Sequence, residues 1–259
     1  MINIQVTKVL EVQQETKTVK TLTFYHSEPV KPGQFYMVWI PGIDEIPMSV
    51  SIIHHDQKGI TFRKVGIATE ALFRMKPNDA IGIRGPFGSS LSLEGNHLFF
   101  VGGGTGIAML APAIEMAREQ GKQVTVVLGA KTKSDLFFKN RIRNTGATLE
   151  IATDDGSQGF LGLASELAKQ LLQQEDIDAI ITCGPELMMK QLLDISKNIP
   201  FQASLERYLK CAIGLCGQCC IGEGLRVCKE GPIFNGKTLK NVKDFGKYRR
   251  DSAGRKIPL

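Results

Sequence analysis

The stretch CAIGLCGQCCIGEGLRVC, residues 211–228, holds five of the chain's six cysteines. Its spacing is Cys211-x4-Cys216-x2-Cys219-x8-Cys228. A C-x4-C-x2-C run with a remote fourth cysteine is the plant-type ligand pattern for a [2Fe–2S] cluster. Residues from about 204 onward carry no long periodic hydrophobic pattern, so a metal centre is needed to hold them. The sequence therefore predicts a small cluster-binding module with a basic tail at 204–259.

The glycines of this stretch fit a tight loop that aims several thiolates at one small cluster. Glycine permits unusual backbone angles and close approach, which suits Gly214 and Gly217. A structural zinc site is the alternative, but zinc ribbons usually pair two short C-x2-C knuckles, and only one is present here. The adjacent Cys220 points elsewhere, and we interpret it as a small packed residue. The predicted cluster ligands are Cys211, Cys216, Cys219 and Cys228.

Residues 1–93 consist of short segments rich in Val, Ile, Thr and Phe, separated by turn residues such as Pro41-Gly42. Several short strands with this punctuation predict a small antiparallel β-barrel. One short helix is expected among them, from Thr69 to Met75. The expected strands are 4–12, 18–25, 35–40, 48–53, 59–65 and 80–84.

Residues 94–203 alternate apolar strands with helical patterns, which predicts a parallel sheet covered by helices on both faces, an α/β domain. The domain begins with a strand, a glycine turn and a helix. Expected strands are 98–101, 124–129, 148–152 and 179–182, and expected helices are 107–120, a stretch after 134, 163–173 and 186–197.

The composition, 42% hydrophobic and 22% charged, is typical of a globular protein. No apolar run reaches the ~18 residues that a membrane span needs. The first six residues alternate like a strand and show no signal-peptide pattern, so we expect a cytoplasmic protein without membrane contact. The formal charge is +6, and no nucleic-acid motif accompanies it. Much of the excess forms a basic tail, which is either solvated or docks a partner: Lys243, Lys247, Arg249, Arg250, Arg255 and Lys256.

The glycine turn at 101–106 follows a strand and opens a helix, a context in which backbone N–H groups can receive a phosphate. It lacks the last glycine of a G-x-G-x-x-G motif, because that position is Met109. Taken alone, it fits a plain strand–helix connection equally well. Cys183 ends an apolar strand, where open α/β sheets bind ligands, although a cysteine there is more often merely buried.

In this order, the motifs resemble the ferredoxin-reductase family, in which a flavin-binding barrel precedes a nicotinamide-nucleotide domain. With the cysteine loop added, the chain is similar to the electron-transfer subunits of NAD-linked dihydroorotate dehydrogenases. The resemblance covers nearly the whole chain. It is carried by Pro47-x-Ser49, Gly66-x-Ala68-Thr69, Gly85-Pro86-Phe87-Gly88, the glycine turn with Pro112, Cys183-Gly184-Pro185, Leu205–Cys211 and Cys228–Phe234.

The resemblance implies electron transfer between NAD(H), FAD and the [2Fe–2S] cluster, and onward to an FMN-containing catalytic subunit in pyrimidine biosynthesis. Two copies of each subunit would form a heterotetramer. A flavin links the cofactors because it is stable with zero, one or two electrons, and the protein positions the cofactors. The catalytic subunit must be a separate chain, because a (β/α)8 barrel takes ~250 residues.

The resemblance also implies cofactor residues, and it assigns no catalytic side chain. The flavin ring and ribityl chain would contact Pro47, Met48, Ser49 and Val50. The ribityl and pyrophosphate groups would contact Lys64, Val65, Gly66, Ala68 and Thr69. The nicotinamide nucleotide would contact Gly103, Gly104, Thr105 and Gly106, with Cys183 beside its ring.

One position departs from the family pattern. The family usually has an arginine before P-x-S, where it pairs with the flavin pyrophosphate, and this chain has Ile46. The loss of a bidentate guanidinium predicts weaker FAD binding unless Arg63 or Lys64 supplies the charge. Two other functions stay open: a diaphorase-like subunit of a hydrogenase or sulfur-reducing complex, and a non-enzymatic binding module stabilised by zinc.

Overall fold

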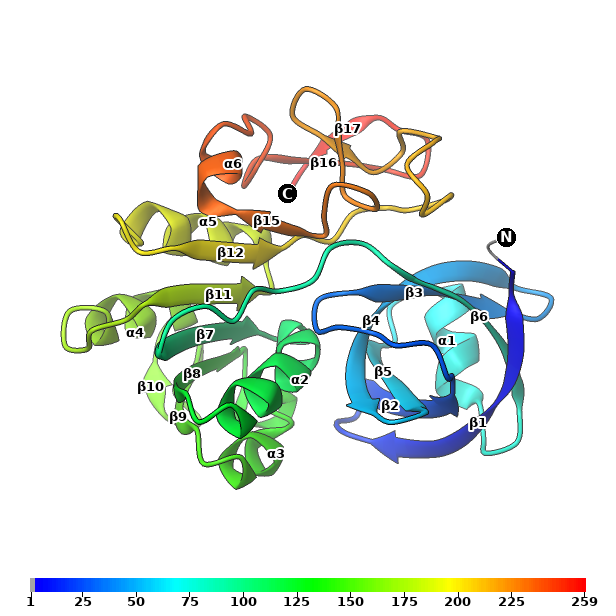
Figure 1. Cartoon of the computed structure of the whole chain (residues 1–259), viewed down its shortest axis with the longest axis horizontal. Helices are drawn as coiled ribbons and strands as arrows, with labels where there is room; N and C mark the ends of the chain where they lie inside the picture. Colours follow the sequence, from blue (N-terminus) through cyan, green and yellow to red (C-terminus); the bar gives the residue numbers. More distant parts are fainter. Residues whose placement is uncertain (1–2) are drawn as a thin grey trace.

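The computed structural model describes residues 3–259, so the first two residues of the predicted N-terminal strand pattern, Met1 and Ile2, lie outside the described residues. Figure 1 shows three parts in chain order: a barrel (blue to cyan), an α/β sheet (green to yellow) and a C-terminal part made of short elements (orange to red). The barrel and the C-terminal part both lie against the sheet. The domain limits at residues 93 and 203 stay predictions. The last parallel strand ends at Ser204, next to the second of them.

The first part is a closed antiparallel barrel with strand order β1-β2-β5-β4-β3-β6. It closes because β1 pairs with β6 as well as with β2, which leaves no free sheet edge. Fully buried side chains such as Leu22, Tyr36 and Ile60 fill it. The predicted barrel is confirmed. Its elements are β1 (Gln5–Gln14), β2 (Val19–Tyr25), β3 (Phe35–Ile40), β4 (Asp44–His54), β5 (Gln57–Arg63), α1 (Ile67–Arg74) and β6 (Ala80–Phe87).

Two barrel strands are longer than predicted, and both extensions matter for the cavity described below. β4 begins at Asp44, which pairs with Ile40, so Pro47 and Ser49 lie inside a paired strand. β6 continues to Phe87, which pairs with Phe35. The predicted strands were shorter because Pro47 precedes the first and Gly85-Pro86 follows the second, and both residue types disfavour strands. Pairing with neighbouring strands extends both of them in the folded protein.

The second part is a sheet of order β10-β9-β8-β7-β11-β12-β15, parallel except for β15. The helices α2 and α3 cover one face, and α4 and α5 cover the other. The predicted doubly covered parallel sheet is confirmed. Its elements are β7 (His97–Gly103), α2 (Gly106–Glu119), β8 (Gln123–Ala130), η1 (Lys133–Asp135), α3 (Lys139–Asn144), β9 (Thr148–Thr153), β10 (Phe160–Leu161), α4 (Ala164–Leu171), β11 (Ala179–Cys183), α5 (Glu186–Ile195) and β12 (Phe201–Ser204).

The C-terminal part contains only short elements, as predicted, but one of them joins the sheet. β15 pairs antiparallel with β12, and one apolar cluster runs from Phe35 of the barrel through Leu192 of α5 to Cys219 and Cys228. The three parts therefore share a core. The elements are β13 (Cys220–Ile221), β14 (Leu225–Arg226), β15 (Ile233–Asn235), α6 (Gly236–Lys240), β16 (Tyr248–Arg250) and β17 (Lys256–Pro258).

A buried ion pair fixes the path of the chain where it leaves the sheet. Arg207 donates to both carboxylate oxygens of Glu186, the first residue of α5, with Nη2 at 2.9 Å from Oε1. The N–H of Gly246 donates to the same carboxylate at 2.8 Å. The Arg207 and Glu186 side chains are only 3% and 6% exposed. Removing one partner of such a pair leaves an uncompensated buried charge.

Glu186→Gln keeps the shape of the side chain but removes its charge, so it should cost about 3 kcal/mol of stability. For a chain of this size, that corresponds to a fall of roughly 6–12 °C in unfolding temperature. Thermal unfolding followed by circular dichroism checks this. The matched control is Asp194→Asn on the same helix, which breaks the exposed pair with Lys190 and should cost under about 1 kcal/mol. Equal small shifts in both variants would contradict the structural role of the buried pair.

Candidate functional site

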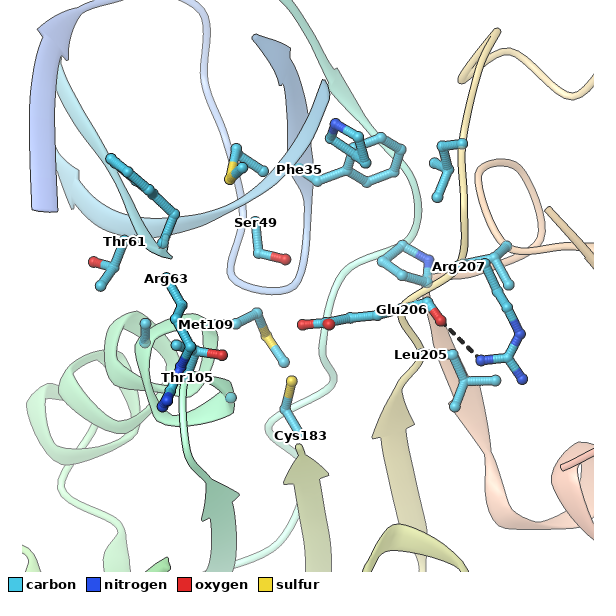
Figure 2. A pocket seen from close by; sticks show the side chains of 18 of the residues that line it. Phe35, Ser49, Thr61, Arg63, Thr105, Met109, Cys183, Leu205, Glu206 and Arg207 are labelled. Atoms are coloured by element: carbon cyan, nitrogen blue, oxygen red, sulfur yellow. Dashed lines mark hydrogen bonds between the residues drawn. The ribbon is translucent and has the colours of Figure 1, made fainter. Parts of the chain in front are cut away.

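A cavity of about 330 Å³ lies where the barrel, the sheet and the C-terminal part meet. Figure 2 shows its walls: the strands of the barrel above, the start of α2 and the end of β11 below, and the chain after β12 at the side. The volume is within the range of small-molecule sites, which are commonly found between domains and at the carboxyl ends of parallel strands. The cavity is therefore the candidate cofactor site.

The floor of the cavity is built by close packing between the glycine turn and the end of β11. β7 pairs with β11 so that Gly102 lies opposite Cys183. A Cβ atom on Gly106 would lie 2.1 Å from the carbonyl oxygen of Cys183, so only glycine fits there. Gly104 has a φ of +55°, which also favours glycine. Packing and backbone angle thus explain these two glycines before any ligand is considered.

Most of the predicted cofactor residues surround this cavity. Val50 is fully buried in the barrel core, so only its backbone is available to a ligand. The Lys64 ammonium lies over the Phe73 ring, 5.2 Å from its centre, and not in the cavity wall. Gly66 and Ala68 lie at the start of α1, and Gly103 and Gly104 lie in the turn beneath the cavity. The predicted residues that line the cavity are Pro47, Met48, Ser49, Val65, Thr69, Thr105, Gly106 and Cys183.

The start of α1 is organised by one side chain. The hydroxyl of Thr69 accepts hydrogen bonds from the N–H groups of Val65 and Gly66, at 2.9 and 3.0 Å, and donates to the Gly66 carbonyl. Val65 is 77% exposed beside this turn. The turn therefore presents an ordered backbone with an apolar residue at the edge of the cavity.

Sequence analysis did not assign several lining residues to the site. Thr61 lies on β5, which is next to the Pro47–Ser49 strand in the barrel. Arg63, named above only as a substitute for the family arginine, ends the same strand and also lines the cavity. Leu205, Glu206 and the residues after them follow the carboxyl end of β12, which sequence analysis did not assign as a strand. The rule that ligands bind beyond the carboxyl ends of parallel strands could have found them. The other unassigned lining residues are Phe35, Phe62, Ala108, Met109, Arg207, Leu209, Val227 and Pro232.

Glu206 is the acidic residue among the described residues that line this cavity. Its side chain is open to the cavity but surrounded by protein, and it points toward Cys183 and Met109 (Figure 2). Burial raises the pKa of Glu206. Burial, and after it the nearby Glu206, also raise the pKa of the Cys183 thiol. Cys183 is therefore a neutral thiol beside a carboxyl group that holds its proton more tightly than a solvated one does.

The four predicted cluster cysteines lie as two contacting pairs. The backbone N–H of Cys216 points at Cys211 Sγ, and that of Cys228 points at Cys219 Sγ. A [2Fe–2S] cluster takes two thiolates on each iron, whereas structural zinc takes all its ligands on one ion. Two neighbouring pairs of cysteines are the arrangement that two irons require.

Backbone N–H groups point at the sulfurs of this loop. Those of Leu215 and Cys216 lie 3.4 and 3.5 Å from Cys211 Sγ, and that of Cys228 lies 3.4 Å from Cys219 Sγ. Burial raises the pKa of Cys211, but these N–H donors outweigh it and lower the pKa to about 6. Such donors favour a sulfur that carries negative charge, as a cluster ligand does. Cys220 Sγ instead lies 3.8 Å from the Gly224 carbonyl oxygen.

The cysteine loop and the cavity are neighbours. Val227, next to Cys228, lines the cavity. Arg84 of β6 donates to the Cys211 carbonyl at 3.1 Å and pairs with Glu45 of β4, the strand that carries Pro47 and Ser49. The barrel wall is thus held directly against the loop. Among residues 3–259, no helix is long and apolar enough to cross a membrane.

Comparison with known proteins assigns the family. A family profile described as the iron-sulfur cluster binding domain of dihydroorotate dehydrogenase B matches residues 206–240, which include all four paired cysteines. A Methanocaldococcus jannaschii protein named as a probable dihydroorotate dehydrogenase B (NAD(+)), electron transfer subunit, is 45% identical over 253 residues, which is 96% of each chain. The chain belongs to this electron transfer subunit family. A Methanothermobacter thermautotrophicus protein of the same name is 43% identical over 268 residues, covering both chains completely.

Solved structures agree with the family and the fold. A chain from the NADH-dependent reduced ferredoxin-NADP oxidoreductase, studied for flavin-based electron bifurcation, superposes with a TM-score of 0.82 and 26% identity. It covers 94% of this chain and 91% of its own length. The ferredoxin reductase of carbazole 1,9a-dioxygenase, at 18% identity and a TM-score of 0.68, shares the fold over 76% of this chain and 66% of its own. The expected ferredoxin-reductase fold is confirmed.

Glu206→Gln should stabilise the protein, and increasingly so as the pH rises. Because burial raises the pKa of Glu206, ionisation is less favourable in the folded protein than in the unfolded one. The wild type therefore loses stability as the pH rises through the folded-state pKa, whereas the glutamine variant does not. We expect similar unfolding temperatures near the ordinary glutamate pKa of about 4.3 and a higher one for the variant at alkaline pH. Thermal unfolding across pH measures the difference, with the exposed Glu94→Gln as control. A constant difference across pH would contradict this assignment.

Proposed function

We propose that this chain is the electron-transfer subunit of a dihydroorotate dehydrogenase, with FAD in the central cavity, NAD(H) as substrate at the carboxyl ends of the sheet and a [2Fe–2S] cluster on the four paired cysteines. One observation carries the proposal: a single cavity is bounded by the Pro47–Ser49 strand, by Cys183 and by Val227 next to Cys228. A ligand in that cavity lies between the sheet and the cysteine loop. A flavin bound there would therefore adjoin both the proposed nucleotide site and the proposed cluster.

The residues of this chain position the cofactors and keep water away. FAD, when bound, takes two electrons from a nicotinamide and passes them on singly, which is the chemistry that this arrangement serves. Phe35 and Met109 form apolar parts of the cavity wall. Cys183 offers a neutral thiol, and Glu206 holds a proton beside it. Position and local electrostatics, rather than covalent catalysis, are what these side chains contribute.

The partner in this proposal is a catalytic dihydroorotate dehydrogenase subunit, because the relatives are named as electron transfer subunits of that enzyme. We further propose that the partner carries FMN, that two copies of each chain assemble and that the complex is cytoplasmic. The same family assignment favours this function over a hydrogenase or sulfur-reducing subunit. The paired cysteines and the iron-sulfur family profile oppose a zinc-stabilised binding module.

We propose that the cysteine loop faces this partner. Leu215, between the first two cluster cysteines, is 80% exposed, and Cys216 is exposed as well. The basic tail lies against the same loop, since Gln218 donates to the Asp251 carbonyl at 2.7 Å. Exposed Leu215 and the basic tail beside it are suited to a partner surface that offers an apolar contact surrounded by acidic residues.

Cys228→Ser should abolish the cluster, whereas Cys220→Ser should leave it in place. The serine hydroxyl replaces one of the paired sulfurs in the first variant, and in the second the lost sulfur lies outside the pairs. Visible absorption and EPR of anaerobically purified protein, before and after dithionite, measure the flavin and a rhombic [2Fe–2S] signal, and iron and sulfide assays give the stoichiometry. A colourless wild type that contains zinc would sink the proposed function. Equal cluster loss in both variants would refute the ligand assignment alone.

Reversing the charge at Arg249 and Arg250 should weaken binding to the catalytic subunit and flatten its dependence on salt. Rim charges act mainly through long-range attraction, so about a tenfold loss at low ionic strength is expected. Titration at several salt concentrations measures it. Reversal of the exposed Arg74 and Lys76 on the barrel makes the same change in net charge and serves as control. If affinity and salt dependence match those of the control, the tail has no docking role.

A further inference from the structure

A row of hydroxyl groups crosses three strands of the barrel and ends at a carboxyl group. Thr21 of β2 lies directly opposite Thr61 of β5, and their hydroxyl oxygens are 2.9 Å apart. The Thr61 hydroxyl donates to Ser51 of β4 at 2.8 Å, and the Thr21 hydroxyl donates to the Glu15 carboxyl group at 2.7 Å. Each distance is typical of an O–H···O hydrogen bond. The four side chains therefore form one continuous chain of hydrogen bonds.

The two ends of this row lie at different cavities. Thr61 lines the central cavity, which adjoins the beginning of α2. Glu15 is half-buried in the wall of a second cavity of about 1020 Å³, which lies beside the end of α2 and has exposed residues such as Gln13 at its edge. Between them, Thr21 is only 3% exposed, so its hydrogen bonds are protected from competing water. The row therefore connects the central cavity with the outer surface through the protein interior.

Glu15 is the member of the row that can change its charge. Burial raises the pKa of Glu15, and the Thr21 hydrogen bond and the positive charge of Arg141 offset only part of that rise. Arg141 is itself paired with Glu115. A carboxyl group with a raised pKa can accept a proton from one side and release it to solvent on the other. The other titratable groups in the wall of the second cavity are Glu11 of β1, His54 of β4, Glu115 and Glu119 of α2, and Lys139 of α3.

The proposed electron path leaves a proton behind. Oxidation of NADH gives NAD⁺, two electrons and one proton, whereas an iron–sulfur cluster accepts electrons only. One proton must therefore leave the central cavity for each NADH consumed, and one must enter when the reaction runs in reverse. Ligands that fill the cavity exclude water from it. Hydrogen-bonded groups of the protein are then the route by which a proton can reach solvent.

We propose that Thr61, Thr21 and Glu15 form a proton relay from the central cavity to the second cavity, by which the proton of each oxidised NADH leaves. This inference rests on the proposed function and goes beyond it. The Thr61 hydroxyl takes a proton from the cavity and gives its own to Thr21, which gives its own to the Glu15 carboxylate. Glu15 then releases a proton to solvent. Each hydroxyl gains one proton and loses one, so the relay moves one proton and no electrons, while Ser51 anchors the Thr61 hydroxyl.

The test compares Thr21→Val and Glu15→Gln with wild type in the full-length protein that contains FAD and the cluster. Each variant oxidises NADH with ferricyanide, a one-electron acceptor, so that every turnover must release one proton. Loss of a positioned proton carrier should lower kcat about tenfold or more and leave KM for NADH unchanged. The solvent deuterium isotope effect on kcat should increase, because proton transfer becomes rate-limiting. Imidazole, a small proton carrier, should restore part of the rate in both variants.

A second measurement is independent of turnover. Infrared titration of wild type should show a protonated carboxyl band that persists above the ordinary glutamate pKa of about 4.3 and is absent from Glu15→Gln. The difference between these two spectra separates the band from that of Glu206. In Thr21→Val the band should persist to still higher pH, because the Thr21 hydrogen bond lowers the pKa of Glu15. A Glu15 band that does not respond to Thr21→Val would overturn the link between the two residues.

Thr23→Val is the matched control. Thr23 is a buried threonine on the same strand, and its hydroxyl accepts a hydrogen bond from Gln57, outside the row. Equal rates and isotope effects in Thr21→Val and Thr23→Val overturn the relay and leave the proposed function intact. If Thr21→Val does not fold, Glu15→Gln decides, since it changes only the half-buried end of the row. A wild type that binds no FAD and oxidises no NADH refutes the proposed function, and the relay with it.

Discussion

The buried ion pair between Glu186 and Arg207 fixes the path of the chain after its last parallel strand, β12. The carboxylate belongs to the first turn of α5, and the guanidinium belongs to the segment that leaves β12. Because that segment is held there, Leu205, Glu206 and Leu209 line the cavity. The cysteine loop begins at Cys211, immediately after it. Both the cofactor cavity and the cluster loop thus depend on one desolvated ion pair.

The cavity that results is lined by all three parts of the chain. Thr61 comes from β5, Thr105 from the beginning of α2, and Glu206 from the chain after β12. Since no single domain carries all of these residues, the cavity exists only when the barrel and the sheet are packed together. Folding of the whole chain, rather than of either domain, creates the site.

Much of this organisation could be predicted from the sequence, and the exceptions have physical explanations. Alternating strands, strand–helix repeats and the cysteine spacing are local patterns, so they predicted the barrel, the sheet and the cluster loop. β15 has three residues and no periodicity of its own, so its pairing with β12 depends on tertiary contact. Glu206 belongs to the Leu205–Cys211 run that carries the resemblance, but its place in the cavity was not predicted, because that place is set by an unassigned strand. Ile46 shows the reverse case: the family pattern identified the missing charge, whereas only the structure shows that Arg63 lines the cavity and that Lys64 lies over the Phe73 ring.

The pairing of β15 with β12 has a consequence for motion. The cysteine loop lies between two segments that are hydrogen-bonded into or pinned against the α/β sheet, so the sheet and the loop form one mechanical unit. The barrel joins that unit as well. Arg84 donates to the Cys211 carbonyl, the N–H of Ser89 donates to the Gly231 carbonyl at 2.6 Å, and Phe35 belongs to the shared apolar cluster. The distances from the cavity to the nucleotide floor and to the cysteine loop are therefore fixed by one continuous core.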